Sequence, residues 1–275
     1  MTICAPQHIA LRRGHQGGDQ KQNKTTMTQA PHVIRMTQAG PSGPQLHLTE
    51  LTLGAADFTS ALPTQHGHVY YSNPQRGLTV GVWDSTAMQE TFGPYPGDEF
   101  IVVLGGACSL TDADGAAVDV KQHQMAAIRS GAPLCWKQDG YLRKFYLKLS
   151  DPTGTKLSSE AGVVVIDPDT ALTDADALPP VQRGDALERE REFFTNDAGT
   201  MTVGLWDSRA TPGEIGPFFC HEFVVVVEGE VIISELGGIS QTFRAGDAFF
   251  VPKGTQCAWH IPSYIRKFYV GVDAA

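Results

Sequence analysis

The chain of 275 residues repeats itself at a constant spacing of 123 residues. The clearest matched pairs are Trp83 and Trp206, Glu99 and Glu222, Trp136 and Trp259. No gap interrupts the spacing from about residue 71 to residue 149, so the two copies share loop lengths as well as residues. Solenoid repeats have much shorter periods, about 20 to 50 residues, and we therefore expect each copy to fold as a domain with its own core.

Composition and charge exclude several classes of protein. Hydrophobic residues make up 41% of the chain and charged residues 19%, and no apolar stretch approaches the length of a membrane span. The net charge is −9, but residues 1–45 hold five basic residues and one acid, which leaves 16 basic and 29 acidic residues in the remainder. Because an acidic body repels phosphate backbones, we expect neither a nucleic-acid nor a membrane partner.

Cysteine usage and the N-terminal segment bear on location. The five cysteines show no C-x-x-C spacing, which argues against a disulfide framework or a zinc knuckle and favours a reducing, cytoplasmic setting. Residues 1–26 are polar and lack the apolar region of a secretion signal. We expect residues 1–45 to be a disordered or poorly ordered extension, and translation starting at Met27 is an alternative to Met1.

Short apolar runs separated by glycine predict an all-β fold. In the second copy the expected strands cover residues 201–207, 222–227, 231–234, 241–244, 247–251, 257–261 and 265–272. Many short strands at this spacing are typical of a sandwich or barrel, and neither copy offers a long helical period. Residues 223–227 are apolar on both faces of a strand, which predicts a buried interface outside the barrel.

The remaining segments divide the chain. We place the first domain at residues 46–150, a linker at 151–192 and the second domain at 193–275. The linker contains one expected strand, residues 163–166, and the charged stretch 187–192. We interpret that stretch as a solvated face rather than a short helix.

The motif spacing of the second copy resembles that of the cupins. Glu222 is followed by Gly229, and Gly246 by Pro252 and Gly254, at the distances of the two cupin motifs. Together with Trp206, Trp259 and the Arg-Lys-Phe-Tyr run at 266–269, the pattern is similar to the subfamily of ureidoglycine aminohydrolases and ethanolamine-utilisation cupins. The resemblance covers both copies and implies two tandem double-stranded β-helix (jelly-roll) barrels, a bicupin.

The ligand set that this resemblance implies for a metal is incomplete. The two histidines expected before Glu222 are replaced by Gly216 and Phe218, and the histidine of the second motif is replaced by Cys257. By strand alternation Glu222 faces inward, whereas His221 and His260 face outward, as exposed or interface residues. Two donors are too few for a transition metal, so we expect no bound metal and no cofactor.

Six residues of the second barrel are candidates for ligand binding: Glu222, Cys257, Lys267, Tyr269, Trp206 and Trp259. Glu222 is either a general acid or base, or a structural carboxylate bonded to Arg266 or Lys267. Cys257 is a nucleophile only if a cation ionises its thiol, and is otherwise an inert core residue. The tryptophans are also explained as core aromatics.

Three functions are compatible with these residues. The first is binding of a small polar or acidic metabolite in the second barrel, which requires no catalytic or metal-binding residues beyond the side chains present. The second is a metal-dependent hydrolase like the ureidoglycine aminohydrolases, and the third is a structural bicupin whose valine-rich faces serve in packing or a homodimer. The first copy has lost more motif residues, with Leu134 at the place of Cys257, so we expect any ligand in the second barrel.

Overall fold

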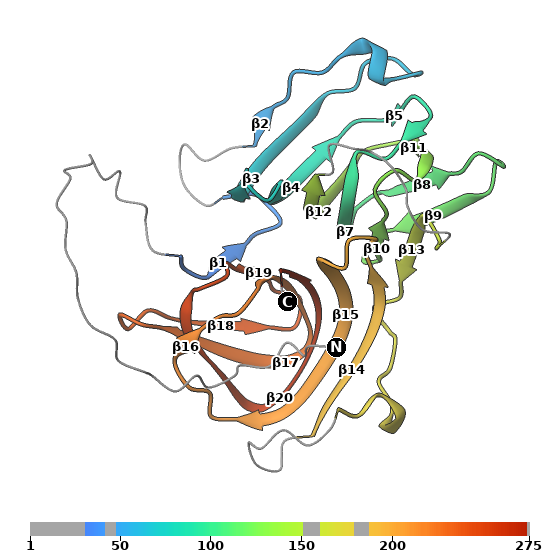
Figure 1. Ribbon diagram of the computed structural model, residues 1–275. Helices are drawn as coiled ribbons and strands as arrows, with labels where there is room; N and C mark the ends of the chain where they lie inside the picture. The colour runs from blue at the N-terminus through green and yellow to red at the C-terminus, as the bar shows by residue number, and fades with distance from the viewer. Residues whose placement is uncertain (1–30, 42–47, 151–159, 179–186, 274–275) are drawn as a thin grey trace, which may run out of the picture.

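The computed structural model describes residues 31–41, 48–150, 160–178 and 187–273, which form two β-barrels side by side (Figure 1). Over these ranges the only helical segments are two 3₁₀ turns, η1 (Ala55–Asp57) and η2 (Asp174–Asp176). Neither is long or apolar enough to cross a bilayer, and no other helix occurs in the described part of the chain. The predicted all-β fold of two jelly-roll barrels is confirmed.

The first barrel consists of two facing sheets. The larger runs in the order β13-β10-β7-β12-β4-β3-β2, and the smaller in the order β5-β11-β8-β9 with β6 also paired to β11. The strands are β2 (Thr49–Glu50), β3 (Gln65–Asn73), β4 (Leu78–Ser85), β5 (Met88–Gln89), β6 (Gly93–Pro94), β7 (Gly97–Gly105), β8 (Ala107–Thr111), β9 (Ala117–Lys121), β10 (Met125–Ile128), β11 (Pro133–Gln138), β12 (Leu142–Ser150) and β13 (Val163–Ile166).

The second barrel is built from fewer and longer strands. They are β14 (Glu188–Thr195), β15 (Met201–Thr211), β16 (Gly216–Pro217), β17 (His221–Glu235), β18 (Ser240–Arg244), β19 (Ala248–Val251) and β20 (Gln256–Val272). Together with β1 (Ile34–Met36) they form one continuous sheet in the order β1-β19-β17-β20-β15-β14, with β16 on β20 and β18 on β17. Here β17 spans both β7 and β8 of the first barrel, and β20 spans β11 and β12.

The strand boundaries reproduce the sequence repeat. Strands β6 and β16, β9 and β18, and β10 and β19 each begin 123 residues apart. Corresponding strands of the two barrels are therefore joined by loops of equal length, as the gap-free spacing predicts.

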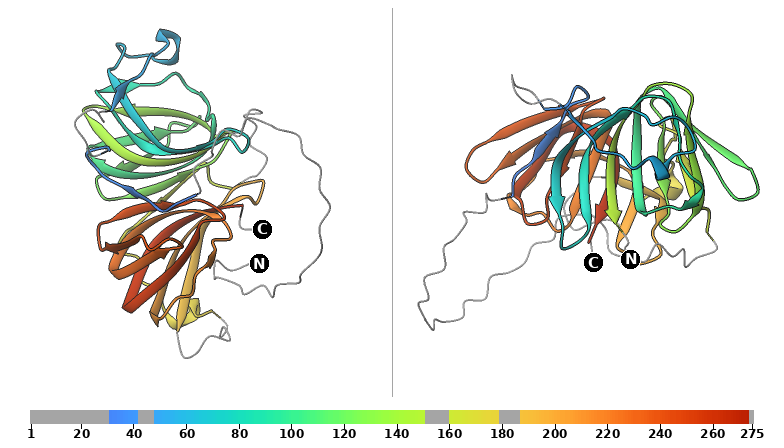
Figure 2. Two further views of the ribbon diagram at one scale, coloured as in Figure 1. Left: turned by 90° about the vertical axis from the view of Figure 1, so that its left-hand side faces the viewer. Right: turned by 90° about the horizontal axis from the view of Figure 1, so that it is seen from above.

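Three apolar cores hold the molecule together. One lies inside each barrel, and the third lies between the barrels, where strand residues such as Val80, Phe100, Phe223 and Phe268 meet. The ring of Phe223 lies 5.8 Å from that of Phe100 and 6.4 Å from that of Phe145. The interface outside the barrel that residues 223–227 predict is thus the contact between the two halves of one chain, which Figure 2 shows from two further sides.

The strand that precedes each barrel pairs with the other barrel. Strand β1 (Ile34–Met36) lies before the first barrel but pairs with β19 of the second, whereas β13 lies before the second and pairs with β10 of the first. Arg35 of β1 forms an ion pair with Asp247 and lies over the ring of Phe243. This reciprocal exchange ties the barrels together beyond their apolar interface.

Two segments differ from the sequence interpretation. Strand β1 lies within the 1–45 extension for which we expected little order, and the charged stretch that we interpreted as a solvated face forms the start of strand β14, where most of its side chains are half-buried. The domain limits at residues 45, 150 and 192 stay predictions, and residues 1–26 lie outside the described part.

Candidate functional site

Each barrel contains a buried lysine–glutamate ion pair enclosed by two tryptophans. In the second barrel the Lys267 ammonium bonds the Glu222 carboxylate and lies 5.1 Å from the ring centre of Trp206 and 4.4 Å from that of Trp259. Lys267 pairs with Trp206 across strands β20 and β15, which fixes the cation against one indole face. The cation–π contacts offset part of the cost of burying the ammonium.

The first barrel repeats this arrangement. Its Lys144 Nζ lies 2.7 Å from Glu99 Oε1, and 5.0 Å and 4.4 Å from the ring centres of Trp83 and Trp136. Burial acts to raise the pKa of Glu99, but the nearby lysines and a hydroxyl donor outweigh it and hold that pKa below its usual value. A feature present in both halves with the same geometry is most simply part of the architecture.

We call the lysine–glutamate pair with its two tryptophans a cage. In the first barrel, neighbouring side chains form hydrogen bonds with the remaining polar atoms of the cage. Tyr95 donates its hydroxyl hydrogen to Glu99 Oε2 at 2.6 Å. The indole N–H of Trp83 donates to Gln65 Oε1 at 3.2 Å, and that of Trp136 donates to Gln138 Oε1 at 3.0 Å. The first cage is therefore closed by its own side chains.

The second barrel lacks these three partners. Phe218 stands at the position of Tyr95, Ile261 at that of Gln138 and Glu188 at that of Gln65, each 123 residues further on. Among the described residues, Glu222 Oε2 and Trp206 Nε1 are buried without a hydrogen-bond partner, and Trp259 Nε1 has only the weak acceptor sulfur of Cys257 beside it. A buried polar atom without a partner costs about 1–3 kcal/mol, so two such atoms around one ion pair call for an external partner.

Tyr269 lies beside the second ion pair, with its ring centre 5.8 Å from Lys267 Nζ. Its hydroxyl donates to Glu190, a residue of β14 that sequence reasoning missed. Burial raises the pKa of Glu190, and the bond from Tyr269 opposes that rise. A Cβ built on Gly204 would lie 2.6 Å from the Tyr269 hydroxyl oxygen, so only glycine lets the ring cross β15 there. The signal for Glu190 was present in residues 188–192, where acids and arginines alternate with the period of a strand.

Cys257 lies in the apolar core of the second barrel with Phe218 and Cys220. Burial raises the pKa of its thiol to about 12, against a smaller opposing effect of Trp259. At neutral pH the thiol is thus protonated, which fits a packing residue and not a nucleophile.

The donor set does not fit the metal that the cupin resemblance implies. The ammonium of Lys267 already neutralises Glu222 and would repel a divalent cation. His221 stacks against Phe250 at 6.1 Å between the barrels, and Nδ1 of His260 lies 3.1 Å from the carbonyl oxygen of Thr211 at the surface. Within the described ranges no three His, Cys, Asp or Glu side chains converge on one point.

Comparison with known proteins agrees with this architecture. Residues 195–269 match the family model of the EutQ-like cupin domain. No curated protein sequence matches the chain.

Solved structures resemble the chain over most of its length. A protein of unknown function of the DUF861 family from Pseudomonas syringae is 24% identical, with a TM-score of 0.66 over 88% of this chain and 100% of that one. A putative glyoxylate-induced protein from Pseudomonas aeruginosa is 14% identical, with a TM-score of 0.53 over 94% of both chains. A putative dioxygenase from Nostoc punctiforme is 12% identical, with a TM-score of 0.56 over 92% of this chain and 86% of that one. The chain therefore has the cupin fold.

Proposed function

We propose that the second barrel binds a small polar molecule at the cage formed by Glu222, Lys267, Trp206 and Trp259. The observation that carries this proposal is the difference between the two halves. The same cage is closed by Tyr95, Gln65 and Gln138 in the first barrel, whereas in the second Glu222 Oε2 and Trp206 Nε1 have no partner among the described residues. The atoms without a partner also indicate which hydrogen-bonding groups the ligand must carry.

The required ligand combines donors and acceptors in a small space. Glu222 Oε2 needs a hydrogen-bond donor, whereas the indole N–H of Trp206 needs an acceptor and that of Trp259 has only the weak acceptor sulfur of Cys257. Amide and ureido groups carry an N–H beside a carbonyl oxygen and meet both needs, so small ureido or carboxamide acids are the favoured class. Tyr269 and Cys257 complete the wall, the first oriented by Glu190 and the second through packing.

The two other functions have less support. A metal-dependent hydrolase needs a site that the Lys267–Glu222 pair occupies with its own cation. A purely structural role leaves the unmatched atoms of the second cage unexplained, and the valine-rich faces are already covered by the opposite barrel. A homodimer and a cytoplasmic location stay predictions.

The test compares two matched substitutions. Glu222→Gln and Glu99→Gln each remove the charge from one lysine–glutamate pair, so their effects on stability are comparable, but only Glu222 faces the proposed ligand. We expect calorimetric titration with small ureido and carboxamide acids to show binding that Glu222→Gln weakens about tenfold or more, because a hydrogen bond to a charged group is worth about 1.5–3 kcal/mol. Glu99→Gln should leave that binding unchanged, and an equal or larger loss from Glu99→Gln would overturn the assignment.

A further inference from the structure

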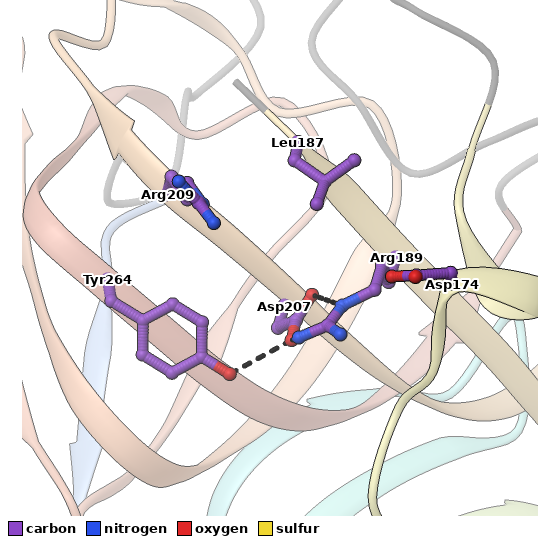
Figure 3. Close-up of a pocket in the computed structure, with 6 residues that line it drawn as sticks. All are labelled: Asp174, Leu187, Arg189, Asp207, Arg209 and Tyr264. Atoms are coloured by element: carbon purple, nitrogen blue, oxygen red, sulfur yellow. Dashed lines mark hydrogen bonds and ion pairs between the residues drawn. The ribbon is translucent and has the colours of Figure 1, made fainter. Parts of the chain in front are cut away.

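A concave site lies on the outer face of the second barrel, away from the Lys267 cage. It has a volume of about 260 Å³ and is lined by Asp174, Leu187, Arg189, Asp207, Arg209 and Tyr264 (Figure 3). The residues come from η2, the start of β14, and strands β15 and β20, which are far apart in the sequence.

The centre of this site is an ion pair with a tyrosine. Arg189 donates two hydrogen bonds to Asp207, from Nε to Oδ1 at 3.1 Å and from Nη2 to Oδ2 at 2.5 Å. Tyr264 donates a third to Asp207 Oδ2 at 2.9 Å. Burial first, and the bond to Asp207 next, raise the pKa of Tyr264 to about 12, so its hydroxyl remains a donor at neutral pH. The two charges of this centre cancel each other.

The first barrel contains the same centre but with different surroundings. There His66 Nδ1 lies 3.0 Å from Asp84 and Tyr141 donates to Asp84 at 3.1 Å, at positions 123 residues before those of the second barrel. The Asp–Tyr contact is therefore architectural. At the rim, Thr64 and Thr86 hydrogen-bond to each other, with Thr64 N 3.0 Å from Thr86 Oγ1.

At the corresponding rim positions the second barrel carries Leu187 and Arg209. Both are exposed, and Arg209 forms no ion pair with any residue in the described ranges. Asp174 on η2 is also exposed, and its carboxylate bonds no described side chain. Figure 3 shows Arg209 and Asp174 on opposite sides of the Arg189–Asp207 pair, with Leu187 between them along the rim.

We propose that this site binds a small zwitterion of the amino-acid type. Its carboxylate would bond the guanidinium of Arg209, its ammonium would face Asp174, and an apolar side chain would lie against Leu187. Within the described part of the chain the site offers one unpaired cation and one unpaired anion about a neutral centre, which matches a zwitterion better than a simple anion or cation. A dianion such as phosphate would meet only one free arginine and be repelled by Asp174.

The experiment is a calorimetric titration of the full chain with L-valine, with isovalerate and isobutylamine as analogues that each keep one charge. We expect L-valine to bind at least tenfold more tightly than either analogue, since both charged contacts contribute. Arg209→Thr, which installs the residue of the first barrel, and Asp174→Asn should each weaken valine binding about tenfold or more.

The control is Arg244→Thr, which removes another exposed arginine of the same barrel, one paired with Glu230. It should leave valine binding unchanged, and all three variants should keep the melting temperature within a few degrees because the altered residues are exposed. The proposal is wrong if L-valine does not bind, if isovalerate binds as tightly, or if Arg209→Thr and Arg244→Thr have the same effect.

Discussion

Lys144→Met tests the energetic role of the buried ion pair where its geometry is most complete. The substitution keeps a long side chain between Trp83 and Trp136 but removes the ammonium that lies 2.7 Å from Glu99. Glu99 is then a buried carboxylate whose remaining described partner is the Tyr95 hydroxyl. Removing one member of a buried pair lowers the free energy of unfolding by about 3–5 kcal/mol, because the other charge is left buried without a compensating charge.

The expected loss is measurable by denaturant or thermal unfolding. At about 2–4 °C per kcal/mol for chains of this size, the melting temperature should fall by about 6 °C or more. The double variant Lys144→Met with Glu99→Gln should recover about 2 kcal/mol, since the amide oxygen still accepts from Tyr95 and no charge remains buried. A single variant within about 1 kcal/mol of the parent chain, or a double variant no better than the single, would refute this reasoning.

The pH dependence gives an independent check on the same pair. The folded pKa of Glu99 lies below its unfolded value, so its contribution to stability is present above about pH 4.5 and is lost as the pH falls through the folded pKa. In Lys144→Met the largest lowering influence is gone, so we expect the folded pKa of Glu99 to lie above that of the parent chain. The gap in stability between the parent chain and the variant should therefore narrow as the pH falls from the folded pKa of Glu99 in the variant to the lower folded pKa in the parent chain.

Two further substitutions test packing. Gly204→Ala should lower stability by about 1–3 kcal/mol in thermal unfolding, because its Cβ would lie 2.6 Å from the Tyr269 hydroxyl, whereas Gly216→Ala, with no atom within 4 Å of its Cβ, should be near neutral. Phe223→Ala should cost about 3–5 kcal/mol through the cavity it leaves between the barrels, whereas Phe92→Ala, 48% exposed, should change the unfolding free energy little.

The parts of the fold that follow from periodicity could be predicted from the sequence. Strand alternation places Phe218 and Cys220 in the barrel core and His221 in the interface, and the structure has them there. The strand at residues 163–166 was also predicted, but its partner in the other half was not, because pairing between distant segments leaves no mark on local composition.

The candidate site was predicted only in part. Glu222 was expected to act as an acid or base or to bond Arg266 or Lys267, and the structure selects Lys267. Glu190 was missed because five consecutive charged residues were interpreted as a solvated face, although Glu and Arg alternate and each type occupies one side of β14. On that strand Arg191 bonds Asp176, while Glu190 receives the hydroxyl of Tyr269.

Exchanging one residue between the halves tests whether Glu222 Oε2 lacks a donor because the second barrel has no counterpart of Tyr95. Phe218→Tyr would place a phenol beside Glu222 Oε2, as Tyr95 lies 2.6 Å from Glu99 Oε2 in the first barrel. We expect the variant to gain about 1 kcal/mol in unfolding free energy and to lose about tenfold or more in affinity for small ureido acids, since its own hydroxyl takes the ligand's place.

The reverse exchange, Tyr95→Phe, should cost about 1.5–3 kcal/mol, because it leaves the same oxygen of Glu99 without its donor. It should also leave ligand affinity in the second barrel unchanged. If Phe218→Tyr lowered stability and kept full affinity, the missing hydroxyl would not be what leaves the cage open, and the ligand would have to bind without Glu222 Oε2. The reasoning is supported if the two exchanges change stability in opposite directions and only Phe218→Tyr loses ligand binding. The residue at this position, Tyr95 or Phe218, then determines whether the glutamate of a cage is bonded within its own barrel or can bond a ligand.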